Sequence, residues 1–447
     1  MLSVLMILAV AATISRTNDP GMRNRAELEA NSLHIWYVSH YAGGPGIGLH
    51  GRAHDLASAW VGQGHCVTVL VAAFHHLLEK PEPLPPERYL DGVRYVAVPA
   101  RRYAGNGVGR LCNILDFTKN LFSVGQSLGQ FAVTPDAVIS SSPHPFSFIP
   151  AYRLARTYGA KAVFEIRDLW PLSLTEILGL SRFHPFVQMC AVAESFSLSK
   201  SDLVASVLPK ADDYLHERGY GDKPFVWVPN GIGGPYIERK LASDNARRAA
   251  EVLAQWRRED RVVIVHAGAL GKPNAIDLLL RAVAFGETCG EAGKCRVLLL
   301  GDGDQASNLE AMASSLHLAG VHFAGRVSKS EVGPLLQSCD IGYGGLRSLD
   351  RLYRYGVSLN KFSDYARAGL PVYLPIAPCG DPVSKSGGGI VRRADTPESA
   401  WSALRDLLLL SPDRRRELGA NGQRYMLRDY DFHRIALRYA LAIQDCT

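Results

Sequence analysis

The chain has 447 residues, of which 47% are hydrophobic and 21% are charged, and its formal net charge is +6. This length exceeds the size at which one hydrophobic core usually stops growing, so we expect two domains. The lysines and arginines are scattered along the chain, which argues against binding to nucleic acid.

Residues 1–32 form an apolar and basic N-terminal extension that we separate from the fold. The apolar run at 2–15 is shorter than the roughly 20 residues that span a bilayer, and no positive segment precedes it. Three interpretations stay open: a signal peptide, a membrane anchor, or a start codon assigned too early. We prefer the third, which makes Met22 the first residue, and place a membrane-associating segment second.

Apolar strands alternate with helices from residue 33 to residue 228. A strand at 33–39, a Gly-rich turn, a helix near 52–62 and a strand at 66–72 form a βαβ opening, which predicts a parallel, doubly wound sheet. Further strands are expected at 95–98, 137–140, 162–166, 203–206 and 225–228. We therefore predict a Rossmann-like N-terminal domain over 33–228.

A Pro- and Gly-rich run at 229–235 interrupts this pattern, and we assign residues 229–260 to a hinge and a charged helical bridge. A second Rossmann-like domain is predicted over 261–430, followed by a C-terminal helix in 431–447. Its strands are expected at 262–267, 296–300, 321–323, 341–342, 371–374 and 389–391. Ligands of such sheets bind outside the carboxyl ends of the strands.

The eight cysteines form no Cys-x-x-Cys pair. A disulfide framework or a zinc site is therefore not expected, and a reducing compartment is the simpler inference. We accordingly expect the body of the protein to lie in the cytoplasm.

The first Gly-rich turn has the spacing Gly46-x-Gly48-x-x-Gly51 and opens a helix. This spacing fits a dinucleotide fingerprint, but the second strand is followed by no acidic residue that could hold a ribose. We therefore predict that Gly46 and Gly48 cradle a phosphate and that Arg52 faces a diphosphate. The alternative is a tight turn with a purely structural role.

The segment at 355–371, YGVSLNKFSDYARAGLP, is the most informative of the chain. It predicts a short helix that begins near Ser358, Asn360 and Lys361 and stops at the Ala-Gly-Leu-Pro sequence. A helix N-terminus attracts anions through its free N–H groups, and Lys361 adds a positive charge. Asp364 lies within reach of the paired hydroxyls of a sugar, so the segment suits a nucleotide sugar.

This segment resembles the C-terminal donor site of the retaining GT-B glycosyltransferases of family 4, which have Ser-x-Asn-Lys, an acidic residue and Ala-Ala-Gly-x-Pro. Tyr-Gly-Val-Ser at 355–358 and Arg-Asp-Leu-Trp-Pro at 167–171 are similar to the subset that acts on lipid-linked sugars in bacterial surface polysaccharide assembly. The resemblance covers roughly 33–440 and implies the GT-B fold, an α/β architecture of two Rossmann-like domains that face a cleft.

The resemblance also implies a reaction. A hexosyl or acetamidosugar group would pass, with retention, from a nucleotide diphosphate, expected to be UDP, to a glycan or a polyprenyl-diphosphate-linked acceptor. Neither a metal ion nor a cofactor is expected. A metal role for Gly301-Asp-Gly-Asp304 is less favoured than a turn that caps the next helix.

By the same resemblance, three more groups contact the donor. The loop from Gly268 to Lys272 is expected near the β-phosphate, although Ala269 stands where many members have arginine. The loop of Gly325 and Arg326 is expected at the nucleobase. Many members also have two glutamates in the 355–371 segment, and Gly356 stands at the position of the first. We therefore assign the donor contacts of that missing glutamate to Arg354, which suits bidentate oxyanion recognition.

Two strand ends of the N-terminal domain are expected on the acceptor side. His144 follows the strand at 137–140 and is expected to orient the acceptor or the leaving phosphate, with an inactive loop histidine as the alternative. Asp168 is the first candidate for contact with the acceptor hydroxyl, and an ion pair with Arg167 is the alternative.

A basic and apolar stretch between 101 and 132 could rest on anionic lipid as a peripheral contact at the inner face of the cell membrane. An ordinary helix with a core face is the alternative. Two other functions also stay open, namely a sugar-nucleotide epimerase of similar architecture and a non-catalytic partner that binds sugar nucleotides.

Overall fold

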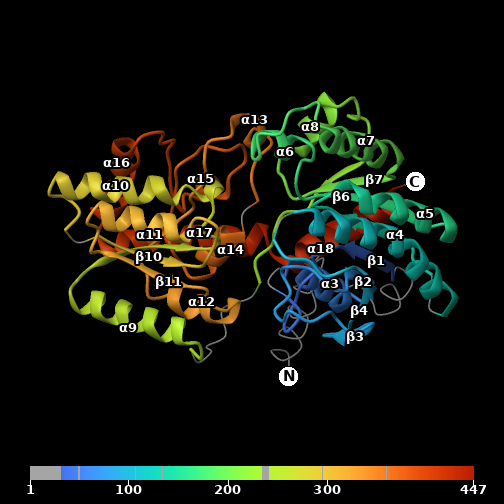
Figure 1. Cartoon of the computed structure of the whole chain (residues 1–447), viewed down its shortest axis with the longest axis horizontal. Helices are drawn as coiled ribbons and strands as arrows, with labels where there is room; N and C mark the ends of the chain where they lie inside the picture. The colour runs from blue at the N-terminus through green and yellow to red at the C-terminus, as the bar shows by residue number, and fades with distance from the viewer. Residues whose placement is uncertain are drawn as a thin grey trace, which may run out of the picture.

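Each half of the chain builds its own parallel sheet, and the two α/β domains lie side by side (Figure 1). The computed structural model describes residues 32–48, 51–105, 107–131, 134–233, 241–293, 295–358 and 360–446. Most of the N-terminal extension, part of the hinge and Leu359 lie outside these ranges.

The N-terminal domain alternates strands with helices. Its strands are β1 (His34–Ser39), β2 (Cys66–Ala72), β3 (Glu87–Leu90), β4 (Val93–Val98), β5 (Ala137–Ser141), β6 (Lys161–Ile166), β7 (Leu203–Ser206) and β8 (Phe225–Trp227). Its helices are α3 (Arg52–Gly62), α4 (Val108–Phe131), η1 (Pro145–Ser147), α5 (Phe148–Tyr158), α6 (Leu172–Glu176), α7 (Pro185–Lys200) and α8 (Ala211–Glu217). The strands pair in the order β3-β4-β2-β1-β5-β6-β7-β8.

The C-terminal domain repeats this alternation. Its strands are β9 (Val262–Ala267), β10 (Cys295–Leu300), β11 (Val321–Gly325), β12 (Ile341–Tyr343), β13 (Val372–Leu374) and β14 (Gly389–Val391), in the order β11-β10-β9-β12-β13-β14. Its helices are α9 (Asp244–Arg258), η2 (Lys272–Asn274), α10 (Ile276–Thr288), α11 (Ala306–Ser315), α12 (Lys329–Leu336), α13 (Asp350–Tyr353), α14 (Asn360–Arg367), α15 (Pro382–Ser386), α16 (Pro397–Leu408) and α17 (Pro412–Asp429). The predicted fold class, two Rossmann-like α/β domains, is confirmed.

Both faces of the N-terminal sheet are buried, which explains why its strands read as continuous apolar runs. In β1, Ile35 and Tyr37 point into the core beneath α3, whereas Trp36 and Val38 point into the core beneath α4 and α5. This alternation follows from the two-residue period of a strand.

The strand β3 was not predicted, because Glu-Arg-Tyr-Leu is not an apolar run. It pairs antiparallel with β4 through a two-residue turn in which Asp91 and Gly92 both have positive φ, at 49° and 77°. An Asp-Gly pair between short strands is a strong hairpin signal, so the turn could have revealed the strand.

The last helix, α18 (Phe432–Asp445), crosses back to the N-terminal domain (Figure 1). Its buried side chains belong to the same core as those of α3 and β1, and the indole N–H of Trp60 donates to the Ala436 carbonyl at 2.9 Å. The core of the first domain is therefore completed by α18, which follows the second domain in the chain.

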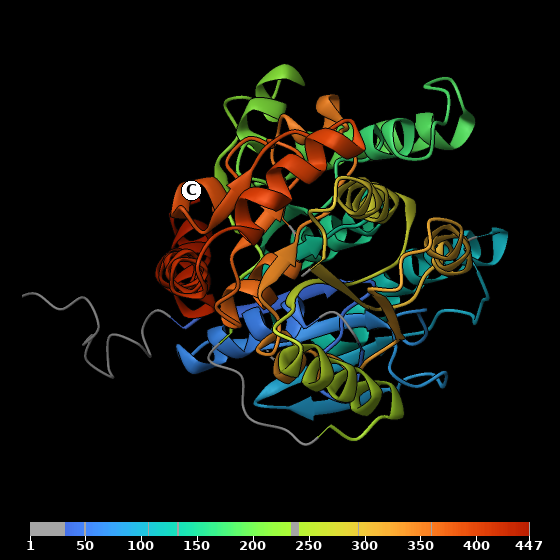
Figure 2. The same ribbon diagram turned by 90° about the vertical axis from the view of Figure 1, so that its left-hand side faces the viewer.

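Helix α4 contains most of the stretch proposed to rest on lipid. Its side chains Ile114, Phe117 and Leu121 are buried in the core, as expected for the alternative of an ordinary helix. No helix of the described residues is long and apolar enough to span a bilayer. A different element, α7 with the loop before it, stands out from the body of the domain (Figure 2).

Arg52 is not available to a diphosphate, which corrects the prediction from sequence. Its guanidinium is buried, forms an ion pair with Glu165 at 3.4 Å, and donates to the carbonyls of Val228 and Pro229, the first of these at 2.8 Å. Glu165 is also buried and accepts from Tyr37. Arg52 therefore fastens the start of the hinge to the N-terminal core.

We predict that Arg52→Met lowers the free energy of unfolding by about 3–5 kcal/mol, because it leaves the Glu165 carboxylate buried without its cation. Urea denaturation would measure the loss, and adding Glu165→Gln should recover part of it. Arg416→Met, which breaks an exposed pair with Asp413, is the matched control and should have little effect. Equal losses in the two single variants would contradict the prediction.

Candidate functional site

The carboxyl ends of β9 and β10 carry two loops that touch through their backbones. A Cβ atom on Gly301 would lie 1.9 Å from the Gly268 carbonyl oxygen, and Gly301 has a φ of 145°, so only glycine fits there. The Leu270 N–H donates to the Asp302 carbonyl at 3.0 Å. This contact leaves the backbone of Gly268 and Ala269 exposed at the edge of the sheet.

Lys361, in the first turn of α14, reaches toward this loop. Its ammonium group donates to Asn274 Oδ1 at 2.8 Å and to the Gly345 carbonyl at 3.2 Å, and both partners are neutral oxygens. Asn274 in turn donates to the Ala269 carbonyl at 2.8 Å. The ammonium therefore lies beside the exposed loop after β9 without a neutralising carboxylate among these partners.

Burial lowers the pKa of Lys361 to about 7. Desolvation disfavours the charged form of the amine, and an anion placed beside it would restore that form. His266, fully buried at the end of β9, adds to the polar surroundings, and burial together with the Lys361 charge keeps its pKa low. Sequence reasoning missed His266 and Asn274, because neither belongs to the motif that revealed Lys361.

Asp364, the predicted ribose ligand, lies one turn further along α14. Both of its carboxylate oxygens accept from the Lys329 ammonium, at 2.7 and 2.6 Å. Lys329 begins α12 and was not singled out from the sequence. Burial raises the pKa of Asp55 in α3, and the positive charge of nearby Lys329 is one of the charges that oppose this rise. Lys329 therefore lies near carboxylates from both domains.

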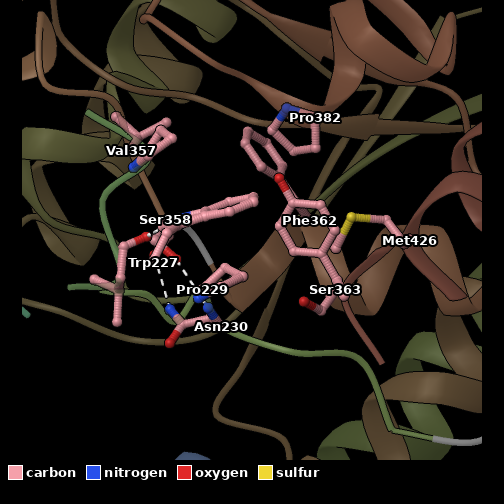
Figure 3. A pocket seen from close by; sticks show the side chains of 12 residues that line it. Trp227, Pro229, Asn230, Val357, Ser358, Phe362, Ser363, Pro382 and Met426 are labelled. Carbon is pink, nitrogen blue, oxygen red and sulfur yellow. Dashed lines mark hydrogen bonds between the residues drawn. The ribbon is translucent and has the colours of Figure 1, made fainter. Parts of the chain in front are cut away.

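Ser358 lies at the contact between the domains and not among the groups around Lys361. Its hydroxyl accepts from the Asn230 N–H at 3.2 Å, and its carbonyl accepts from the Asn230 amide at 2.9 Å (Figure 3). Trp227 and Phe362 line the small pocket around this contact. The prediction that Ser358 binds the donor is corrected in part, since both of its oxygens hold the hinge.

The other predicted donor residues of the C-terminal domain are spread around the same end of the sheet. Asn360 is exposed at the start of α14, and Lys272 is exposed in η2, where its carbonyl accepts from Arg347 at 2.9 Å. Gly325 ends β11 with a φ of 71°. Arg326 is exposed, and its carbonyl accepts from the Asn245 amide at 2.9 Å.

In the N-terminal domain, the turn of Gly46 and Gly48 packs against the chain at 77–78. A Cβ atom on Gly48 would lie 2.6 Å from the Leu77 carbonyl oxygen, so the close approach of two backbones requires glycine there. Gly46 has a φ of 67°, and its carbonyl accepts from Arg88 at 3.0 Å. These contacts agree with the alternative of a structural turn, while residues 49–50 lie outside the described ranges.

His144 is buried, which corrects its predicted place at an open cleft. Its Nε2 lies 2.8 Å from His40 Nδ1, and His40 Nε2 lies 2.8 Å from the amide oxygen of Asn113. Burial lowers the pKa of His144 to about 3, so the ring is neutral at physiological pH. The polar chain from Asn113 to His144 braces the ends of β1 and β5.

Asp168 follows β6, and it is exposed to solvent although protein atoms surround much of its carboxyl group. Its side chain reaches solvent, yet the surrounding protein raises the pKa of its carboxyl group, and the nearby Arg167 opposes that rise. Burial, together with the negative charge of Asp168, raises the pKa of Tyr353 in α13 to about 12. Asp168 therefore lies at the surface where the two domains meet.

Arg354 is also at this surface, but it does not join Lys361. Its guanidinium pairs with Glu217 of α8 and contacts the Tyr355 hydroxyl. It lines a cavity of about 310 Å³ between α6, α7, α8 and the segment after α13. Arg354 thus forms an ion pair between the domains, and its donor contact stays a prediction.

Two protein-family models match the chain. The model of the glycosyl transferase 4-like domain matches residues 48–231, and the model of the glycosyl transferases group 1 matches residues 261–408. Each half of the chain belongs to a glycosyltransferase domain family. The resemblance stated above is thus confirmed at the level of the domains, and the polysaccharide subset stays a prediction.

Solved structures of glycosyltransferases share the whole architecture. Sucrose-phosphate synthase from Thermosynechococcus elongatus has a TM-score of 0.69 at 15% identity, with 92% of this chain and 98% of that chain covered. HepE from Anabaena, solved with UDP and glucose, has a TM-score of 0.62 at 14% identity, with 92% and 100% covered. WaaG, involved in lipopolysaccharide biosynthesis, has a TM-score of 0.62 at 16% identity, with 92% and 100% covered. These likenesses show the GT-B fold, and a comparison with curated proteins gave no match.

The side chains of the candidate site suit an anion better than a metal ion. Among the described residues, no three side chains of His, Cys, Asp or Glu are placed to hold a metal ion. The positive groups near the loop after β9 include Lys361 and Lys272, and also Arg347, which pairs with Asp277. This set can bind an anion at the carboxyl end of the C-terminal sheet.

We predict that the Lys361 ammonium titrates near pH 7, because its burial favours the neutral amine. Reductive methylation with ¹³C-formaldehyde followed by an NMR titration would measure this midpoint, and the Lys361→Arg variant would assign the signal. The exposed Lys385 supplies a reference signal from the same domain. A Lys361 midpoint near the value of about 10.4 that is usual for lysine would contradict the prediction.

Proposed function

We propose that the protein is a retaining glycosyltransferase that moves a sugar from a nucleotide diphosphate donor, UDP-sugar, to a glycan or a polyprenyl-diphosphate-linked acceptor. The observation that carries the proposal is Lys361, a largely desolvated cation that contacts neutral oxygens beside the exposed loop of Gly268 and Ala269. The glycosyltransferase families of both domains support this activity.

The donor would lie across the carboxyl end of the C-terminal sheet. Lys361 and the N–H groups at the start of α14 would hold the diphosphate, with Lys272 and the backbone of Gly268 nearby. Asp364 would accept from the ribose hydroxyls while it keeps the Lys329 pair on its other side, and the loop of Gly325 would face the base. Since negative charge grows on the leaving diphosphate, these groups stabilise the transition state more than the ground state.

The acceptor would approach from the N-terminal domain. Asp168 would orient the acceptor hydroxyl, and its exposure to solvent and its raised pKa support this role. In retaining transfer at one face of the sugar, an oxygen of the leaving phosphate can take the hydroxyl proton as the new bond forms. A separate protein base is then unnecessary, and neither a metal ion nor a cofactor is proposed.

We propose that the acceptor belongs to bacterial surface polysaccharide synthesis and that the transfer takes place at the cytoplasmic face of the membrane. The Arg-Asp-Leu-Trp-Pro sequence at 167–171 supports it, as does the likeness to WaaG, a glycosyltransferase involved in lipopolysaccharide biosynthesis.

We predict that UDP binds more weakly as the pH rises above about 7. The anion favours the protonated form of Lys361, so binding takes up a proton where the free amine is neutral, and affinity falls by up to about tenfold per pH unit. Calorimetry in two buffers of different ionisation enthalpy would measure the uptake. Lys361→Met should bind weakly with no such pH dependence, and the same pH dependence in both proteins would contradict the assignment.

The activity itself is tested with purified full-length protein, a panel of nucleotide sugars, and glycan and polyprenyl-diphosphate-sugar acceptors. We expect acceptor-dependent release of UDP that falls by at least about 100-fold in Lys361→Met and in Asp364→Ala, since each removes a charged donor contact. Asp168→Asn should lower kcat with little effect on the KM for the donor. Lys385→Ala removes an exposed charge of the same domain and serves as the control.

Product analysis separates the alternatives. NMR of the anomeric proton should show retention, and EDTA should leave the rate unchanged. Release of UDP without an acceptor would favour epimerase or hydrolase chemistry, and donor binding without turnover across the panel would favour a non-catalytic partner.

A further inference from the structure

Exposed large apolar side chains gather where α6 leads into α7 and on the outer face of α7. Among the described residues, twelve large apolar residues are exposed, and five of these lie between residues 177 and 192. We call these five the apolar tip: Ile177, Leu178, Phe183, Met189 and Val192. Soluble proteins rarely expose so local a concentration of apolar surface without a use for it.

The exposure of the tip is high. Phe183 is 71% exposed, Val192 70% and Leu178 64%. Met189 and Val192 are three residues apart on α7, so they are neighbours on one helix face. Other residues of α7, such as Val187 and Cys190, pack inward, so the helix already has its own core face. The tip is therefore additional apolar surface, and the fold of the domain does not use it.

The stretch that carries the tip contains a basic residue and no acidic one. No Asp or Glu occurs between residues 177 and 193. Arg182 lies within this stretch, with its guanidinium 4.6 Å from the centre of the Phe183 ring. Arg351, whose side chain is 80% exposed, is close by through its pair with Glu176. Apolar side chains beside exposed arginines, with Glu176 at the edge of the tip paired to Arg351, suit the boundary of an anionic bilayer.

The shape of the region supports the same occupant. The loop before α7 and the start of that helix stand out from the body of the protein (Figure 2). A projecting tip can enter a fluid lipid surface, whereas a protein partner would need a matching groove. Arg182, Gln188 and Arg351 also line the cavity of about 310 Å³ between the domains, so the tip adjoins the cleft.

We propose that the apolar tip inserts into the surface of an anionic phospholipid bilayer and holds the protein there as a peripheral membrane protein. This surface differs from α4, whose apolar side chains are buried in the core. Docking through the tip turns the cleft near Asp168 toward the membrane. Only this last point rests on the proposed function, since it presents the active site to an acceptor at the lipid surface.

The test uses the full-length protein and vesicles without any substrate, so its outcome does not depend on the proposed activity. Sedimentation with vesicles of phosphatidylcholine, and with equimolar phosphatidylcholine and phosphatidylglycerol, measures binding. We expect the wild-type protein to prefer the anionic vesicles. Leu178→Ser combined with Phe183→Ser should lower that binding by at least about tenfold, because two large side chains no longer enter the bilayer. Arg182→Gln should lower binding to anionic vesicles alone.

The control is Leu409→Ser combined with Leu427→Ser, which removes two exposed apolar side chains from the C-terminal domain. All variants keep the apolar N-terminal segment, so its contribution is constant, and an unchanged circular dichroism spectrum and thermal unfolding midpoint would show that each variant is folded. Equal vesicle binding by the tip variant, the control and the wild type would overturn the proposal. A wild-type dimer that the tip variant converts to a monomer, without vesicle binding, would also overturn it and assign the tip to a second copy.

Discussion

The buried pair between Arg52 and Glu165 is the interaction on which the arrangement of the domains depends. Arg52 is fixed by Glu165 in the N-terminal core and holds the carbonyls of Val228 and Pro229. The next residue, Asn230, bonds to Ser358, and α14 begins shortly after it. One continuous path of polar contacts thus runs from the centre of the first sheet to the helix that carries Lys361.

A desolvated lysine with neutral partners gives the candidate donor site its selectivity. A lysine paired with a carboxylate would already be neutralised, and a bound diphosphate would have to break that pair. Lys361 instead contacts an amide oxygen and a carbonyl, which orient the ammonium and leave its charge uncompensated by these partners. The cost of burying this cation is offset only when an anion arrives, so the site favours ligands with concentrated negative charge.

The sequence predicted the fold because strands that are buried on both faces read as short apolar runs, and these runs alternate with helical segments along the chain. It also located α14 and Lys361, since a helix start and its charge lie within a few residues. It could not assign Arg52 correctly, because the partners of that guanidinium lie 113 to 177 residues away in the chain. For the same reason it could not reveal the ion pair of Arg354 with Glu217 of the other domain, or that of Lys329 with Asp364.

His144 illustrates a further limit. Its position after a strand correctly placed it at the carboxyl end of the sheet, but the sequence does not tell how deep a side chain lies. The contact with His40, 104 residues away, buries the ring and excludes the open position that its location suggested. Burial of this kind depends on which loops cover a strand end, and such loops carry no periodic pattern.

The return of α18 to the N-terminal domain affects how the protein forms during synthesis. The core beneath β1 contains Ile435, Ala436 and Tyr439, so it is incomplete until α18 has left the ribosome. The second domain, by contrast, has its strands and most of its helices in place earlier. The first domain to be translated is therefore the last to be finished, and a chain truncated before α18 leaves an apolar groove along α3.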